Sequence, residues 1–354
     1  MNDEGDQGMK TYRLALIGFG NVGQGLAEIL RDRGEALGRE QGVAIVITAV
    51  SDLLKGSVYD PQGLDSAELL TAVQRDGSLA AVSAPYQGWD ALRTIADSNA
   101  DVIVELSYTD LATGQPALRH IETALANGKH VITTNKGPIA LRYPELAALA
   151  AQNGVQLGVE GTVMSGTPAL RLGAQLLAAA GVQRVQGILN GTTNYILTQM
   201  EQGASYADAL ADAQSRGYAE ADPTGDVEGI DAAGKVVILA NMLMGQSLTM
   251  ADVQTTGISG LTAADVAAAA ADGERWKLVG TVEVQEGGQV TASVQPLRLP
   301  LAHPLATVSG ATNAITYATD LLGDVTLVGP GAGRTETGYA LIADLLSLAR
   351  AQRN

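Results

Sequence analysis

The sequence predicts an α/β protein in which a doubly wound parallel sheet of the Rossmann type is joined to a second, α+β domain. Short apolar runs alternate with helical patterns over the first 160 residues, which is typical of parallel strands joined by crossover helices. The first apolar run ends in a glycine-rich turn that opens a helix. Beyond Pro168 this alternation stops, and a chain of 354 residues is long enough for two domains.

The first domain is expected over residues 11–160. Its strands are expected at residues 12–17, 43–50, 101–106, 130–134 and 155–159. Helical stretches lie between them at residues 23–33, 115–127 and 143–152, and the pairs Asn127-Gly128 and Asn153-Gly154 are helix stop signals placed before a strand. Residues 1–10 are acidic and contain glycine, so we expect them to form a flexible tail.

The second domain, for substrate binding and dimerisation, is expected over residues 161–323. Its elements are expected to be a helix to about residue 180, a strand at 184–189, helices at 194–203 and 206–216, an acidic loop, an apolar helix at 236–244 and a helix at 263–271. Strands at 277–285 and 289–298 flank Gly287-Gly288 in the pattern of a β-hairpin. The last strand, at 324–328, and the last helix, at 337–350, are expected to return and complete the first domain with residues 324–354.

The composition excludes several classes of function. The formal net charge of -16 opposes binding to nucleic acid or to an anionic membrane. The absence of cysteine excludes disulfides, thiolate metal sites and a cysteine nucleophile. The chain shows no signal-peptide pattern, and no apolar run reaches the roughly 18 residues of a membrane span. We therefore expect a cytoplasmic protein that binds neither nucleic acid nor a membrane.

The glycine-rich turn is the first candidate site. Glycines between a strand and a helix let backbone amides approach a diphosphate at the helix N-terminus, although the same pattern also forms tight turns that bind nothing. Asp52 ends the second strand, where a carboxylate accepts hydrogen bonds from an adenosine ribose. Lys55 is suited instead to a 2′-phosphate, so the choice between NAD and NADP stays open. The candidate cofactor residues here are Gly18, Gly20, Asn21, Val22, Gly23 and Asp52.

Polar residues also follow two other strands, at the edge where open α/β sheets bind ligands. Ser107, Tyr108 and Thr109 follow the third strand, and Lys136 follows the fourth. We expect all four to contact the cofactor, although a surface lysine is usually only solvated. Two later turns, at residues 190–194 and 329–333, lead from a strand into a helix and supply amides and hydroxyls suited to a carboxylate. The candidates in these turns are Gly191, Thr192 and Gly333.

An acidic loop carries the candidates for proton transfer. Its carboxylates are Glu220, Asp222, Asp226, Glu228 and Asp231. A solvated charge run is the simplest interpretation, and the spacing does not match an EF-hand calcium loop. However, Asp231 and Lys235 lie four residues apart at the start of a helix whose next residues are apolar, which indicates that the helix is buried. Partial desolvation would lower the pKa of the lysine towards a range useful for proton transfer, while the carboxylate orients the amine. The three histidines are scattered, without metal-ligand spacing.

Six segments together resemble the homoserine dehydrogenase family. They are GFGNVG at 18–23, TTNKGP at 133–138, EGTVMSGTP at 160–168, GILNGTTNYIL at 187–197, GYAEADPTGDVEGIDAAGK at 217–235 and GPGAG at 329–333. They cover nearly the whole chain in order. The resemblance implies the NAD- or NADP-dependent interconversion of L-homoserine and L-aspartate 4-semialdehyde in threonine and methionine biosynthesis.

The resemblance also implies roles for individual residues. Lys235 would donate a proton to the aldehyde oxygen as hydride arrives, with Asp231 as its partner, and Lys136 would neutralise charge near the substrate and the nicotinamide. The implied substrate-binding residues are Gly191, Thr192, Glu220, Asp226, Asp231 and Lys235, with Glu220 and Asp226 holding the ammonium group. The family's loop for a monovalent cation, Na⁺ or K⁺, maps mostly through backbone carbonyls to Glu160, Val163, Ser165 and Thr167.

Assembly and regulation are further implications of the resemblance. The family forms homodimers around a shared sheet, and the hairpin at 277–298 offers strand edges for such a contact. Many relatives carry a further C-terminal domain through which threonine inhibits the enzyme. Only residues 351–354 follow the last expected helix, so we expect a short form without that domain.

Two other functions fit part of the pattern. Aspartate semialdehyde dehydrogenase acts on the same aldehyde, but its acyl-enzyme chemistry needs a thiolate, and the chain has no cysteine. A non-enzymatic nucleotide-sensing protein would also use the GFGNVG turn, but it would need a basic DNA-reading module, and the sequence shows none. An assay of hydride transfer separates this second function from an enzyme.

Overall fold

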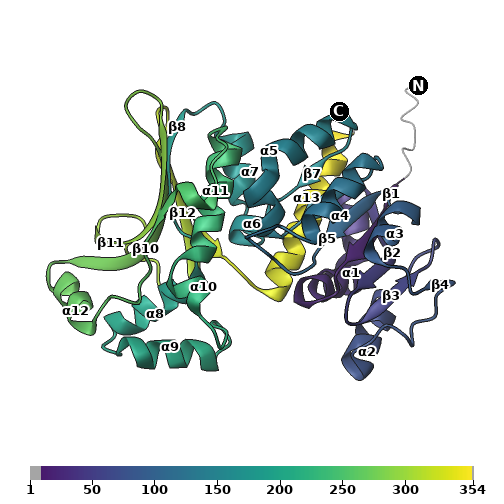
Figure 1. Ribbon diagram of the computed structural model, residues 1–354, viewed down its shortest axis with the longest axis horizontal. Coiled ribbons are helices and arrows are strands. Elements are labelled where there is room, and N and C mark those ends of the chain that lie inside the picture. Colours follow the sequence, from purple (N-terminus) through teal and green to yellow (C-terminus); the bar gives the residue numbers. More distant parts are fainter. Residues whose placement is uncertain (1–8, 353–354) are drawn as a thin grey trace.

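The computed structural model describes residues 9–352, and two sheets with their helices make up the molecule (Figure 1). A flexible tail is expected at residues 1–10, of which residues 1–8 lie outside the described residues. Lys10 is already the first residue of β1. No helix within residues 9–352 is long and apolar enough to cross a membrane.

The first sheet is the expected Rossmann-type sheet, in the order β4-β3-β2-β1-β5-β6-β7. Its strands are β1 (Lys10–Ile17), β2 (Val43–Asp52), β3 (Gly56–Tyr59), β4 (Tyr86–Gln87), β5 (Val102–Glu105), β6 (His130–Thr133) and β7 (Leu157–Gly158). The five neighbouring strands β2, β1, β5, β6 and β7 are parallel. At one edge of the sheet, β3 is antiparallel to β2 and β4 is antiparallel to β3. Its helices are α1 (Asn21–Gln41), α2 (Ser66–Asp76), α3 (Ala91–Asp97), α4 (Ala117–Ala126), α5 (Lys136–Gln152) and the C-terminal α13 (Arg334–Ala351). Strands β3 and β4 are not predicted from the sequence, because strands of four and two residues are too short to show a period.

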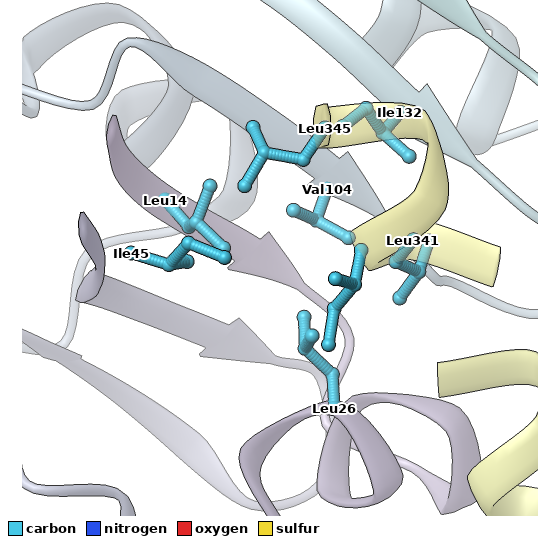
Figure 2. A pocket seen from close by; sticks show the side chains of 8 residues that line it. Leu14, Leu26, Ile45, Val104, Ile132, Leu341 and Leu345 are labelled. Atoms are coloured by element: carbon cyan, nitrogen blue, oxygen red, sulfur yellow. The ribbon is translucent and has the colours of Figure 1, made fainter. Parts of the chain in front are cut away.

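The C-terminal helix returns to this sheet, as expected. Leu341 and Leu345 of α13 line a small apolar cavity together with Leu14 of β1 and Val104 of β5 (Figure 2). The helix also packs closely on α1, because a Cβ added at Gly338 would lie 2.8 Å from the carbonyl carbon of Gly25. These contacts bury apolar side chains of α13 in the core of the first domain.

The second sheet has the order β13-β12-β8-β10-β11-β9. Its strands are β8 (Val182–Ile188), β9 (Val253–Thr255), β10 (Glu274–Val284), β11 (Val290–Pro300), β12 (Thr312–Thr319) and β13 (Gly323–Pro330). Neighbouring strands are antiparallel, except for the parallel pair of β9 and β11. Its helices are α6 (Gly161–Met164), α7 (Ala169–Arg171) continued by a π-helical turn (Leu172–Leu176), α8 (Gly191–Glu201), α9 (Tyr206–Ser215), α10 (Thr224–Val227), α11 (Ile230–Leu243), a 3₁₀ turn (Met250–Asp252) and α12 (Ala263–Ala271).

One expectation about this sheet needs correction. The strand expected at 324–328 to complete the first domain is β13, which pairs with β12 in the second sheet. Only three residues separate these two strands, so they form a hairpin and β13 cannot reach the first sheet. The expected hairpin is formed by β10 and β11; β8 pairs with β10, and β9 pairs with β11 across residues 292–294 only, so the hairpin still offers part of the outer side of β11 as a strand edge. The two outer strands of this sheet are β13 and β9.

The apolar helix of the second domain is α11, and it is buried as expected. It packs against β10 and β11 on one side and against α5 of the first domain on the other (Figure 1). Residues 232–241 are all buried. The helix begins at Ile230, earlier than the apolar run alone, so its first turns lie where the two domains meet.

Candidate functional site

A cleft of about 940 Å³ is lined by both domains. Candidate residues from the sequence that line it are Val22, Ser107, Tyr108, Thr109, Lys136, Val163, Ser165, Gly191, Thr192, Glu220, Asp226, Asp231, Lys235 and Gly333. The candidates outside its lining are Gly18, Gly20, Asn21, Gly23, Asp52, Glu160 and Thr167. The fold thus brings residues more than 200 positions apart into one cavity.

The Asp231 carboxylate is the centre of the cleft's charge network. Its Oδ2 lies 2.7 Å from Lys235 Nζ, and its Oδ1 lies 2.8 Å from Lys136 Nζ. Lys136 is the first residue of α5, whereas Asp231 and Lys235 are one turn apart on α11. Burial raises the pKa of Asp231, but the two lysines outweigh burial and hold this pKa well below its usual range. Asp231 is therefore a fixed negative charge shared by two domains.

The two lysines differ in their environments. Lys235 is only 7% exposed, and its Nζ also donates to the Leu189 carbonyl at 2.6 Å. Burial lowers the pKa of Lys235 below its ordinary value; Asp231 opposes this change and Lys136 adds to it. For Lys136 the charge of Asp231 is the largest influence, and it raises the pKa. Lys235 is therefore suited to exchange a proton, whereas Lys136 stays cationic.

Asn190 is a residue of the site that the sequence analysis did not select. Its Oδ1 accepts from Thr193 N at 2.9 Å and so caps α8. Its Nδ2 donates to Asp226 Oδ1 at 2.7 Å and to Asp231 Oδ2 at 3.1 Å. One carboxamide therefore fixes two carboxylates. The sequence signals only the helix cap, because these carboxylates lie 36 and 41 residues further along the chain.

Besides Asp231, the acidic loop contributes the carboxylates of Glu220, Asp222 and Asp226 to the cleft. Asp226 is half-buried, and burial raises its pKa, although the hydrogen bond from Asn190 opposes that rise. Glu220 is exposed and lines the same cleft. Thr192, at the start of α8, donates its hydroxyl to the Tyr218 carbonyl at 2.6 Å and ties the acidic loop to this helix. The loop is therefore anchored beside the buried lysine.

The glycine-rich turn connects β1 to α1 beside the cleft. Gly18 has φ +103°, and a Cβ there would lie 2.5 Å from the Leu106 carbonyl oxygen, so only glycine fits. Gly20, which precedes α1, has nothing within 4 Å of an added Cβ. That open space at the N-terminus of a 21-residue helix fits a diphosphate.

The Asp52 carboxylate stabilises the glycine-rich turn through hydrogen bonds from backbone amides. Its Oδ2 accepts from Phe19 N at 2.7 Å, and its Oδ1 accepts from the amides of Leu54 and Lys55 at 3.0 and 2.9 Å. Burial raises the pKa of Asp52, but these three amides outweigh burial and lower it, so the carboxylate is ionised. The Lys55 ammonium lies 3.7 Å away.

The segment at 160–168, which carries the candidate cation ligands, is held by hydrogen bonds to residues of both domains. The Glu160 carboxylate accepts from the amides of Leu170 and Arg171 at 2.8 and 2.9 Å, so it caps α7. Ser165 has φ +53°, the one positive φ of a non-glycine residue in the described part of the chain. Ser165 Oγ lies 2.8 Å from Thr337 Oγ1, and Thr167 Oγ1 donates to the Pro330 carbonyl at 2.9 Å. Within residues 9–352 no three histidine or carboxylate side chains group as metal ligands.

A Rossmann-type sheet with an open glycine-rich turn, beside a cleft that holds a buried lysine–carboxylate pair, is typical of nicotinamide-dependent oxidoreductases. Family models agree with this class: "Homoserine dehydrogenase, NAD binding domain" matches residues 18–160, and "Homoserine dehydrogenase" matches residues 168–346. The chain belongs to the homoserine dehydrogenase family, whose members are NAD(P)-dependent oxidoreductases.

Individual relatives support the same assignment over nearly the full length. The NAD(+)-dependent homoserine dehydrogenase of Pseudomonas canavaninivorans is 47% identical over 342 residues, which are 96% of this chain and 97% of the relative. The crystal structure of a homoserine dehydrogenase from Thiobacillus denitrificans has a TM-score of 0.84 at 34% identity and covers 98% of this chain and 75% of its own. The structure of a hyperthermophilic archaeal homoserine dehydrogenase in complex with NADPH has a TM-score of 0.81 at 29% identity. The match covers 96% of this chain and 98% of that chain.

Proposed function

We propose that Lys235, Asp231 and Lys136 carry the proton transfer by which this oxidoreductase interconverts L-homoserine and L-aspartate 4-semialdehyde. The single observation that supports this proposal most is the Lys235 ammonium, buried in the cleft, with a lowered pKa and its Nζ 2.7 Å from Asp231. A bound nicotinamide supplies or accepts the hydride at the substrate carbon. The protein must then supply or accept the proton at the substrate oxygen.

In the direction of reduction, Lys235 Nζ donates its proton to the aldehyde oxygen. The Leu189 carbonyl and Asp231 hold the amine at 2.6 and 2.7 Å, so its orientation is set before substrate binds. In the direction of oxidation, neutral Lys235 accepts the proton of the homoserine hydroxyl. Lys136 stays positive in both directions and stabilises negative charge that develops on the oxygen.

The substrate's amino-acid group is proposed to lie between the acidic loop and α8. Glu220 and Asp226 line the cleft and are suited to hold the ammonium group. Gly191 and Thr192 form the N-terminal turn of α8, where free backbone amides favour a carboxylate. In this proposed arrangement the side-chain oxygen of the substrate would reach Lys235, which lines the same cleft.

For the cofactor we propose that NAD is used at least as well as NADP. The diphosphate would lie over Gly20 at the N-terminus of α1, and the adenosine ribose near Asp52 at the end of β2. The ionised Asp52 repels a 2′-phosphate, and Lys55 offsets that repulsion only in part. The proposed contacts to the rest of the dinucleotide are Gly18, Asn21, Val22, Gly23, Ser107, Tyr108, Thr109, Lys136 and Gly333.

A monovalent cation and a homodimer complete the proposal. The carbonyls of Glu160, Val163, Ser165 and Thr167 lie on a segment held in place by Thr337 and Pro330, which suits a Na⁺ or K⁺ ion that takes backbone oxygens.

The outer strand β13 leaves one edge of the second sheet unpaired, and Val328 on it is exposed. Pairing with a second copy of the chain would cover such an edge.

The first test removes the proton-transferring amine. Lys235→Met should lower kcat by about 10² to 10⁴, the loss typical of a positioned acid or base, and should leave dinucleotide affinity nearly unchanged. Lys277→Met is the matched control. Lys277 is also buried and also pairs with a carboxylate, Glu201, at 3.1 Å, but it does not line the cleft. Near-wild-type turnover in Lys235→Met would remove Lys235 from the mechanism.

The second test uses pH. Homoserine oxidation needs neutral Lys235, so kcat should rise with pH through a midpoint below the ordinary lysine pKa of 10.5. Lys136→Met removes a charge that lowers the pKa of Lys235, so the midpoint should move to higher pH. Asp231→Asn removes a charge that raises this pKa, so the midpoint should move to lower pH. Shifts of the same sign in both variants would contradict the proposed electrostatic coupling.

The third test measures cofactor preference as the ratio of kcat/KM for NAD and NADP. We expect a ratio of one or more in the wild type, and a decrease in Asp52→Asn, since the variant loses the charge that repels a 2′-phosphate. Asparagine keeps a carbonyl that accepts from the turn. A wild-type ratio strongly in favour of NADP that does not change in Asp52→Asn would show that Asp52 does not face the ribose.

The fourth test addresses assembly. Light scattering at micromolar concentration should give twice the mass of the chain, and Val328→Lys on β13 should lower that value by placing a charge on the proposed contact. A monomer in the wild type would exclude the dimer.

The fifth test addresses the cation. The melting temperature should be higher in KCl or NaCl than in tetramethylammonium chloride at equal ionic strength, because a bound ion stabilises the folded state. Equal melting temperatures in all three salts would argue against the site.

A further inference from the structure

Glu105, the last residue of β5, is a buried carboxylate beneath the cleft. Its exposed fraction is 0%. Ser107 donates to its Oε1 through both the backbone amide, at 3.1 Å, and the hydroxyl. His120 Nδ1 of α4 lies 3.2 Å from the same oxygen, and Asn135 Nδ2 lies 3.3 Å from Oε2. One carboxylate therefore gathers groups from the loops that follow two neighbouring strands.

Asn135 extends this network to the charged centre of the cleft. Its Oδ1 accepts from Gly137 N at 3.2 Å and caps α5, and its Nδ2 also donates to the carbonyls of Ser107 and Tyr108 at 3.0 and 3.1 Å. The next residue is Lys136, whose ammonium contacts Asp231. Glu105 thus connects the loop at 107–109 to the start of the helix that carries Lys136.

Strand order places this network under one half of the dinucleotide. The glycine-rich turn follows β1, Asp52 ends β2 on one side, and β5 and β6 lie on the other side. A diphosphate on the turn and an adenosine ribose at Asp52 leave the nicotinamide half over the ends of β5 and β6. Lys136 lies there too, next to the residues that exchange the proton.

We propose that Glu105 is a positioning residue that fixes the nicotinamide half of the cofactor against the proton-transfer cluster, by holding the 107–109 loop and the start of α5 in one arrangement. The inference rests on the proposed function of that cluster. Strand β5 is otherwise made of buried valine and isoleucine, so its packing alone requires no carboxylate. A buried carboxylate is costly unless it is hydrogen-bonded. Its bonds here are with polar groups of the two loops and His120, and no lysine or arginine among the described residues pairs with it.

The test compares two ligands by isothermal titration calorimetry, without turnover. NADH carries the nicotinamide, whereas ADP-ribose is the same molecule without it. Glu105→Gln puts an amide donor where the carboxylate accepted, so one of the loops loses its bond. We expect about tenfold weaker binding of NADH, with ADP-ribose affinity within about twofold of wild type, and kcat lowered by about tenfold or more.

Two further variants keep the result decisive. His120→Leu removes a contact of Glu105 from the side away from the cleft, since His120 is on α4 and does not line the cavity. It should shift NADH binding in the same direction by a smaller factor, and it serves as the test if Glu105→Gln does not fold. Thr48→Val is the control: it removes a buried hydrogen bond to the Leu14 carbonyl in the same sheet and should not change the ratio of the two affinities.

The outcomes separate this proposal from the proposed function. Equal weakening of both ligands in Glu105→Gln and His120→Leu, or no weakening of NADH, would overturn the positioning role and leave Glu105 a structural residue. Failure of the wild type to bind NADH or NADPH would instead contradict the proposed function. A loss confined to NADH supports the positioning role, because general destabilisation would weaken both ligands.

Discussion

The Asp231 carboxylate, held between two ammonium groups, is the interaction on which the cleft depends. It contacts Lys136 of one domain and Lys235 of the other at 2.8 and 2.7 Å. A buried lysine beside a second positive charge would be unfavourable without this anion, and a buried carboxylate would be unfavourable without the lysines. The contact with Asp231 therefore opposes the effect of burial on the pKa of Lys235, and the two contacts together join α5 to α11.

The path of the chain brings these groups together. The last strand of the second sheet, β13, is followed by the turn at 329–333 and then by α13. Helix α13 packs on α1 and contributes to the apolar core of the first domain. The same turn lines the cleft, and the neighbouring segment at 160–168 is attached to it and to α13 through Thr167 and Ser165. The cleft wall is thus fixed by connections that also join the domains. Because Asp231 and Lys235 are largely buried, the electrostatic effect of Asp231 on the lysines is stronger than it would be in water.

Much of this arrangement could be predicted from local sequence patterns. The strand–turn–helix at Gly18 and the apolar run after Lys235 predicted a dinucleotide turn and a buried helix, because both signals lie within a few residues of the feature that they describe. The role of β13 could not be predicted in this way, because it depends on β12, whose pairing with β8 joins residues more than 120 positions apart. Asn190 and Glu105 were missed for a related reason. Each has an ordinary local context, and only the folded chain shows that their partners converge from several elements.

The most direct measurement of the central interaction is an NMR titration of lysine side chains labelled with ¹³C at Cε, with the signals of Lys136 and Lys235 assigned from single variants. We expect Lys235 to titrate below the ordinary lysine pKa of 10.5 and Lys136 to titrate above it, because burial is the largest influence on the first pKa and the charge of Asp231 is the largest influence on the second. Equal pKa values for the two lysines, or a higher pKa for Lys235 than for Lys136, would contradict this expectation.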